Sequence, residues 1–246
     1  MLPGDEVTLI AHRGDAARHP ENTLEAFAAA ARLGVRHVEL DVQLTADHVP
    51  VVLHDETLRR THGLRQRVTA HTLAELARLG VLTGGTRPPA VPRLAEFASW
   101  LEGEPGLHAF VEIKKESLRA HGRHAMLAAI EPVLRPVSGR VTVISYDAPV
   151  LGMAQRAGFE TGYVLPGMSR RARGVAQRLS PRYLFVDRHH LVRAGACWPG
   201  PWTWAVFEVD TPVIAGRLLG MGVKWLESMN PARLLAAGMG PAARAR

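Results

Sequence analysis

Short apolar segments of strand type alternate along the chain with segments in which apolar residues recur at helical spacing. The strand-type segments are rich in Val, Ile, Leu and aromatic residues, whereas the longer, helix-type segments repeat apolar residues every three or four positions. Strands are predicted over 7–12, 37–41, 49–54, 108–114, 141–145, 161–165, 183–186, 202–208 and 224–227. Helices are predicted over 23–33, 94–101, 120–134, 150–157, 169–179, 212–219 and 231–236, with Asn22 as the N-cap of the first.

The alternation itself indicates the fold class. A strand and a helix following each other from end to end are typical of a parallel sheet with helical crossovers. About eight such units favour closure into a TIM (β/α)8 barrel over an open sheet. No glycine-rich nucleotide fingerprint follows the first strand, which disfavours the doubly wound alternative. The sequence therefore predicts an α/β protein with a single barrel domain over residues 1–246.

One segment, 56–92, does not follow the alternation. It contains the turn signals "THG" and "LTGGTRPP" around one short helical stretch, 73–79. We interpret it as a small excursion inserted into the barrel after the second strand region, without a separate core.

Composition narrows the class of partner. The formal net charge is +7, but the arginines are scattered, and only "SRRARG" and the terminal "ARAR" are clusters. Because no aromatic interleaving or groove-reading motif accompanies the charge, nucleic-acid binding is not expected. No apolar run reaches the roughly 18 residues of a membrane span and the start lacks a secretion signal, so we expect no stable membrane insertion and a cytoplasmic location. The single cysteine, Cys197, excludes an internal disulfide and is interpreted as a partly buried apolar residue.

Ionisable residues occupy strand positions where a core would carry apolar ones. Residues two apart in a strand share a face, so Glu39 and Asp41 lie together, and Glu112 and Lys114 repeat the pattern. Active sites of such barrels form at the C-terminal strand ends, where three carboxylates would repel one another unless a cation lay between them. Oxygen ligands without cysteine favour Ca²⁺ or Mg²⁺, while the many histidines leave another divalent ion open.

Two histidines, His12 and His54, end predicted strands and complete this candidate site. Arg13 and Gly14 follow His12 and suit a phosphate group, because Arg donates a planar fork and Gly lets the backbone come close. Structural interpretations compete with these. His12 could be a core histidine, Glu112 and Lys114 could form a structural ion pair, and His54 alone indicates little.

A series of short motifs resembles the glycerophosphodiester phosphodiesterase family. The motifs are "HRG" at 12–14, "PENT" at 20–23, "ELDV" at 39–42, "VVLHD" at 51–55 followed by "LRRTHG", "EIK" at 112–114, "ISYD" at 144–147 and "WAVF" at 204–207. They run in family order over nearly the whole chain. Each is unspecific alone, but the series is highly specific.

The resemblance implies a TIM barrel that hydrolyses a small-molecule glycerophosphodiester to sn-glycerol 3-phosphate and an alcohol, with a divalent metal, Ca²⁺ or Mg²⁺. The implied roles are metal ligation by Glu39, Asp41 and Glu112; general acid/base catalysis by His12 and His54; and phosphate or substrate binding by Arg13, Lys114, Glu21 and Trp204. His54 is favoured as the acid. The attacking oxygen could come from water or from the substrate's own glycerol hydroxyl.

The chain departs from the family pattern at two places, which concern substrate preference. Phe207 stands where the family often has Asn, and Ser228 and Met229 stand where it often has Thr-Asp. A lysophospholipase D or sphingomyelinase D-like activity is the alternative within the enzymes, although no amphipathic docking helix is apparent. A non-catalytic phosphodiester-binding barrel would not need both histidines. A metal-dependent sugar isomerase would also use carboxylates but release no phosphomonoester.

Overall fold

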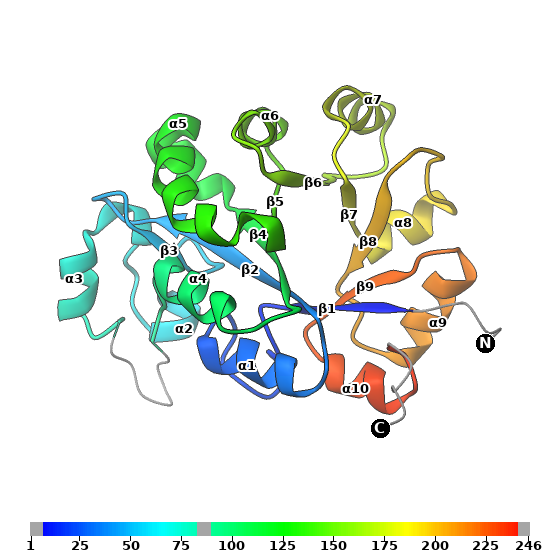
Figure 1. Ribbon diagram of the computed structural model, residues 1–246, viewed down its shortest axis with the longest axis horizontal. Helices are drawn as coiled ribbons and strands as arrows, with labels where there is room; N and C mark the ends of the chain where they lie inside the picture. The colour runs from blue at the N-terminus through cyan, green and yellow to red at the C-terminus, as the bar shows by residue number, and fades with distance from the viewer. Residues whose placement is uncertain (1–6, 83–89, 241–246) are drawn as a thin grey trace.

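Eight parallel strands close into a barrel, and this confirms the predicted TIM (β/α)8 fold (Figure 1). The computed structural model describes residues 7–82 and 90–240. The strand order is β1-β9-β8-β7-β6-β5-β4-β2-β3, and pairing of β1 with β2 closes the ring. The strands are β1 Thr8–His12, β2 His37–Leu44, β3 Pro50–Val52, β4 His108–Ile113, β5 Val141–Ser145, β6 Glu160–Val164, β7 Tyr183–Asp187, β8 Thr203–Phe207 and β9 Trp225–Ser228.

The helices surround this ring, as Figure 1 shows. They are α1 Leu24–Arg32, α2 Arg59–His62, α3 Leu73–Arg78, α4 Leu94–Glu102, α5 Lys115–Leu134, α6 Ala148–Arg156, α7 Arg170–Leu179, α8 Arg188–Ala194, α9 Pro212–Gly220 and α10 Pro231–Ala236, with 3-10 turns at Val68–Ala70 and Arg135–Arg140. Three differ from expectation. Neither α2 nor α8 has a predicted counterpart, and α5 begins five residues early because it continues through a kink at Gly122, whose φ is 81°.

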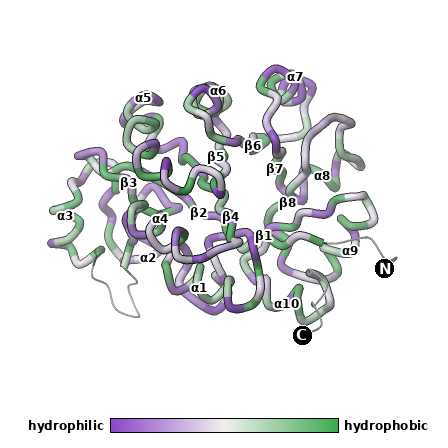
Figure 2. The backbone as a smooth tube through the Cα atoms, in the orientation of Figure 1, coloured by the Kyte–Doolittle hydropathy of each residue, from purple (hydrophilic) through white to green (hydrophobic). Residues whose placement is uncertain are grey.

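Two apolar layers lie on the two faces of the barrel strands. Inside the ring, Phe110 meets the edges of Tyr183 and Phe185 at centroid distances of 5.0 and 5.1 Å. A larger layer packs the outer strand faces against the helices. In Figure 2, α7 is mostly hydrophilic, because it carries the arginines of "SRRARG" on its outer side. Within the described ranges, the helices are all too short or too polar to cross a membrane.

The third predicted strand is not a barrel strand. β3 pairs with β2 antiparallel, with Val52 opposite Val42 and Pro50 opposite Leu44. β2 extends beyond the barrel, and a turn at 45–49, in which the Thr45 hydroxyl bonds Asp47 and Val49, sends the chain back. His54 therefore reaches the barrel mouth on a hairpin rather than at the end of a parallel strand.

Residues after β3 form a compact unit beside this hairpin. α2, the first 3-10 turn and α3 pack around a small apolar cluster, which consists of Val51, Leu53, Leu58, Val68, Leu76, Val81 and Val91. The predicted helical stretch at 73–79 is found as α3. The predicted excursion at 56–92 lies partly outside the described residues, since 83–89 are not among them.

Candidate active site

Three carboxylates meet inside the barrel at its C-terminal mouth. Glu39 and Asp41 project inward from β2, each with a side chain only 1% exposed. Glu112 lies on β4 directly beside Asp41 in the parallel register. One oxygen from each of the three lies within 4.8 Å of the others. Alternation of faces along β2, together with its pairing to β4, thus brings these residues together.

Two cationic side chains bind this cluster, and both contact Asp41. Lys114 Nζ lies 3.1 Å from Asp41 Oδ1 and 3.0 Å from Glu112 Oε1, while Arg13 Nε lies 3.0 Å from Asp41 Oδ2. Burial alone would raise the pKa of Asp41, but the charges of Lys114 and Arg13 hold it well below its usual range. Asp41 is therefore the ionised centre of the cluster.

Asn22 holds Asp41 from the other side and is not the N-cap of α1. Its side-chain amide donates to Asp41 Oδ2 at 2.9 Å, and its Oδ1 accepts from the Asp41 backbone N–H at 3.2 Å. The cap of α1 is Thr23, whose hydroxyl accepts from the Ala26 N–H. The predicted cap was therefore wrong by one residue. Because Thr23 caps the helix, the Asn22 side chain is available to bind Asp41.

The turn after β1 aims Arg13 at the cluster and depends on Gly14. Arg13 has a φ of 57°, and its backbone N–H bonds Glu39 Oε2 at 3.2 Å. Gly14 has a φ of 84°, and a Cβ there would lie 2.6 Å from the Ala26 carbonyl carbon. Only glycine fits this close approach of the turn to α1.

We expect Gly14→Ala to lower the free energy of unfolding by about 2–5 kcal/mol, the sum of left-handed strain and overpacking. Chemical denaturation measures this loss. Gly34→Ala is the matched control, since Gly34 has a φ of 87° but open space around it, and should lose only about 1–2 kcal/mol. Equal losses in both variants would remove the steric part of the argument.

His12 lies between two buried carboxylates. Its Nε2 is 3.3 Å from Glu227 Oε1 and 3.7 Å from Glu39 Oε2. Burial, with a further contribution from the Arg13 charge, lowers the pKa of His12 to about 3. The imidazole is therefore neutral near pH 7.

His54 is held at the mouth by its neighbours. Its Nδ1 lies 2.8 Å from Asp55 Oδ1, and a third of the side chain is exposed. The buried Gln43 amide donates to the backbone carbonyls of Leu53, His54 and Asp55 at 3.1, 3.2 and 2.6 Å, which fixes the chain here. The Asp55 contact orients the ring, leaving Nε2 for another partner.

Glu21 stands at the rim and pairs with two arginines. Its Oε1 lies 3.1 Å from Arg13 Nη1 and 2.6 Å from Arg60 Nη2. Burial would raise the pKa of Glu21, but the hydrogen bond from Arg60 and the charge of Arg13 lower it. Glu21 is therefore an ionised partner of Arg13 at the edge of the site.

Trp204 is not brought to this mouth. It lies in the outer layer between β8 and the helices, with its ring edge-on to Trp198 at a centroid distance of 5.6 Å. Alternation along β8 turns Phe207 to the barrel interior instead. Cys197 is partly buried as predicted, and burial raises the pKa of its thiol to about 11, which suits a packing role.

Glu227 is a site residue that sequence reasoning missed. It lies on β9 next to His12, is 3% exposed, and with His12 and Glu39 forms a second group whose ligand atoms lie within 4.8 Å of one another. Among the described residues, its only ion-pair partner is His12. Burial, followed by the charge of Glu112, raises the pKa of Glu227 well above its usual range.

A carboxyl whose pKa is raised by folding destabilises the folded protein once the pH exceeds its unfolded value. We therefore expect Glu227→Gln, measured in chelator, to raise the melting temperature by a few degrees at pH 7. The gain should vanish near pH 4, where the carboxyl is protonated in both states. Thermal unfolding from pH 4 to pH 8 tests this, with the exposed Glu102→Gln as control. A lower melting temperature of Glu227→Gln at pH 7 would contradict it.

The residues present fit a divalent cation. The donors are carboxylate oxygens, which hard cations prefer, and Glu39 Oε1 is buried with no hydrogen-bond partner among the described residues. Burial, followed by the charge of Asp41, raises the pKa of Glu39, and a cation between Glu39, Asp41 and Glu112 would supply that partner and reduce the repulsion. The acidic cluster can therefore hold a metal ion.

Part of the chain is similar in sequence to curated proteins. A protein of Caldanaerobacter subterraneus subsp. tengcongensis, "Glycerophosphodiester phosphodiesterase", is 42% identical over 112 residues, which are 43% of this chain and 44% of that relative's own length. The chain thus matches less than half of that relative.

Solved structures share the fold over nearly all of the chain. A Silicibacter pomeroyi protein is similar with a TM-score of 0.80 at 24% identity, covering 96% of both chains. An Oleispira antarctica phosphodiesterase, in complex with the product sn-glycerol-3-phosphate, has a TM-score of 0.77 at 22% identity, covering 94% of this chain and 96% of its own. At these identities the likeness carries the fold alone.

A family model decides membership. The model of the glycerophosphoryl diester phosphodiesterase family matches residues 12–156, more than half of the chain, and this stretch includes all three carboxylates and both histidines of the mouth. The chain belongs to the glycerophosphoryl diester phosphodiesterase family.

Proposed function

We propose that the protein hydrolyses glycerophosphodiesters to sn-glycerol 3-phosphate and an alcohol, using a divalent cation, Ca²⁺ or Mg²⁺. One observation carries the proposal: an acidic cluster, two cationic side chains and two histidines converge at a single barrel mouth. The names of the curated relatives and the product bound by the Oleispira phosphodiesterase support the same reaction.

The acidic cluster would hold the cation through Glu39, Asp41 and Glu112. When bound, the cation would neutralise charge on the phosphate oxygens as the transition state forms. A bound cation would also explain why three carboxylates lie buried together, where they would otherwise repel one another.

Arg13 and Lys114 would hold the phosphate. Both already point at the cluster through Asp41, so their positions are fixed before substrate arrives. Fixed donors stabilise developing negative charge without having to reorganise during the reaction. The guanidinium of Arg13 can donate two parallel hydrogen bonds to the phosphate, whereas Lys114 acts as a point charge.

The histidines would move the protons. His12, neutral at pH 7, accepts the proton of the attacking oxygen, and His54, with protons on both ring nitrogens, gives its Nε2 proton to the leaving alcohol as the phosphorus–oxygen bond breaks. The contact of His54 Nδ1 with Asp55 leaves Nε2 to face the substrate. The residues suit either water or the glycerol hydroxyl as the attacking group.

The test is release of sn-glycerol 3-phosphate from glycerophosphocholine by the purified protein, after chelation and after Ca²⁺ or Mg²⁺ is restored. Release that returns with the cation supports the proposal. Lysophosphatidylcholine and sphingomyelin are assayed in parallel, since cleavage of these lipids with no release from glycerophosphocholine would assign a lipid phosphodiesterase instead. Binding of glycerophosphocholine without turnover under any cation would assign a phosphodiester-binding barrel.

A further inference from the structure

Arg60 bridges two carboxylates at the rim of the mouth, and the proposed mechanism gives it no role. Its Nε lies 2.7 Å from Asp55 Oδ2, and its Nη2 lies 3.0 Å from Asp55 Oδ1. The same guanidinium donates to Glu21, with Nη1 2.7 Å from Oε2 and Nη2 2.6 Å from Oε1. Both carboxylates therefore receive a two-point contact from one planar group.

The two carboxylates lead to different halves of the site. Asp55 contacts His54 Nδ1 at 2.8 Å, and Glu21 accepts from Arg13 Nη1 at 3.1 Å. Arg60 thus connects the histidine on the hairpin with the arginine that follows β1. Arg60 thus forms ion pairs with both Glu21 and Asp55.

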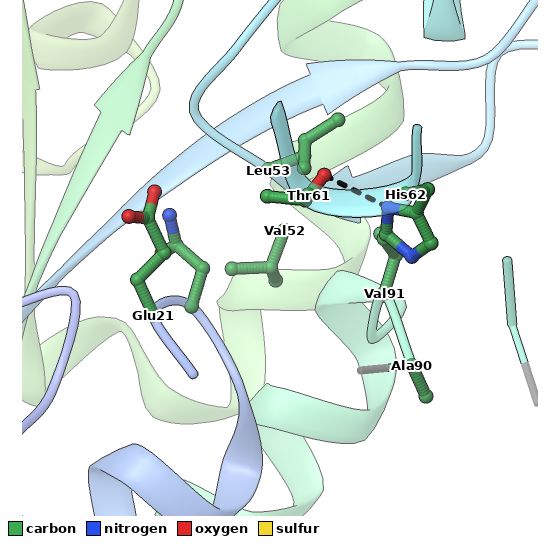
Figure 3. A pocket seen from close by; sticks show the side chains of 8 residues that line it. Glu21, Val52, Leu53, Thr61, His62, Ala90 and Val91 are labelled. Atoms are coloured by element: carbon green, nitrogen blue, oxygen red, sulfur yellow. Dashed lines mark hydrogen bonds between the residues drawn. The ribbon is translucent and has the colours of Figure 1, made fainter. Parts of the chain in front are cut away.

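The position of Arg60 is set from outside the barrel. Arg60 lies in the one-turn helix α2, and the preceding Leu58 is fully buried in the small cluster beside β3. The Leu58 N–H also bonds the Gln66 carbonyl at 2.9 Å. Thr61 and His62 of the same helix line a small pocket together with Glu21, so α2 and Glu21 face one another (Figure 3).

We propose that Arg60 is a positioning residue, which holds the Asp55–His54 pair and the Glu21–Arg13 pair in fixed relation across the mouth. Isolated surface ion pairs contribute little, and half of the Arg60 side chain is exposed. This one differs because it is bidentate on both sides and belongs to a chain of five charged or ionisable side chains. Without it, Asp55 and Glu21 would repel each other and Asp55 would turn from His54.

The kinetic part of the test rests on the proposed function. Arg60→Ala should lower kcat for glycerophosphocholine by about 10–100-fold, with a smaller change in KM, because the histidine acts in the transition state. Guanidinium chloride at millimolar concentration should restore part of kcat. Arg59→Ala is the matched control, since Arg59 is the exposed neighbour in α2 and its side chain has no ion pair among the described residues.

Three kinetic results would overturn the proposal. These are a kcat of Arg60→Ala within twofold of the wild type, an equal loss in Arg59→Ala, or a loss that guanidinium does not restore and that comes with a lower melting temperature. The last result would make Arg60 a residue of stability alone.

A second measurement does not depend on activity. Nitrogen NMR of the imidazole rings reports which ring nitrogen of His54 carries the proton. When the ring is neutral, the wild type and Arg59→Ala should hold its one proton on Nδ1, facing Asp55, and Arg60→Ala should show a mixture of the two tautomers. An inactive wild type with this difference would remove the proposed reaction but keep the positioning role. An unchanged His54 signal in Arg60→Ala would remove the positioning role.

Discussion

His54→Ala should turn over glycerophosphocholine at least about 100-fold more slowly than the wild type, with the fold intact. The alcohol leaves as an alkoxide unless a proton reaches its oxygen, and His54 is the histidine at the rim, where a leaving group would depart. The ring is partly exposed and is held by Asp55 and by the loop that Gln43 anchors, so its removal leaves no buried cavity. The measurement is steady-state release of sn-glycerol 3-phosphate, with circular dichroism and a melting temperature for the fold.

A substrate with a better leaving group sharpens this prediction. An aryl glycerophosphodiester releases a phenolate that needs no proton, so His54→Ala should lose much less activity on it than on glycerophosphocholine. His124→Ala, an exposed histidine of α5, is the matched control and should behave as the wild type. Equal losses of His54→Ala on both substrates would assign His54 a role other than the acid, and near-normal turnover would remove it from the mechanism.

Chelation of the divalent cation should lower turnover by at least about 100-fold, because neutralisation of charge on the transition state is worth several kcal/mol. Restoring Ca²⁺ or Mg²⁺ should restore the rate. The cation binds the folded protein alone, so at 100 times its dissociation constant it should add about 2.7 kcal/mol to stability, or roughly 5–11 °C in melting temperature. Calorimetry of the chelated and reloaded protein measures this gain directly.

Glu112→Gln separates the cluster from nonspecific effects of the chelator. The variant keeps the shape of the side chain and removes one of the three charges, so both the rate and the thermal gain should require far more cation. Glu102→Gln, an exposed glutamate at the end of α4, should match the wild type. Full activity of the wild type in excess chelator would contradict the metal proposal.

Local patterns predicted the barrel and most of the mouth for a physical reason. Strand alternation fixes which side chains share a face, so Glu39 and Asp41 could be paired from their spacing in the sequence, and the register of β2 with β4 then brings Glu112 alongside. The same rule could have found Glu227, since it places Trp225 and Glu227 on one face of β9. Only the closure of the barrel, however, brings that face next to His12.

Other features of the structure were not predicted, for different physical reasons. Asn22 has the composition of a helix cap, but its amide binds Asp41, nineteen residues away in the chain. Trp204 follows a family motif, yet the alternation of β8 turns it outward. α8 was missed because it is seven residues long and opens directly after β7, with Asp187 both ending the strand and capping the helix. Arg60 belongs to a run of charge whose contacts no pattern specifies.

The proposed catalytic residues lie on two parts of the structure, the closed barrel and the antiparallel hairpin, which differ in how many backbone pairings hold them. Glu39, Asp41, Glu112 and His12 lie on strands that are paired on both sides within the closed ring, whereas His54 returns to the mouth on β3, a three-residue strand outside that ring. Segments with few long-range backbone bonds open at lower free energy than the barrel that supports them. Partial opening of the hairpin would therefore withdraw His54, the proposed proton donor, while the acidic cluster stays assembled, so mild denaturant should abolish the proposed activity before it unfolds the barrel.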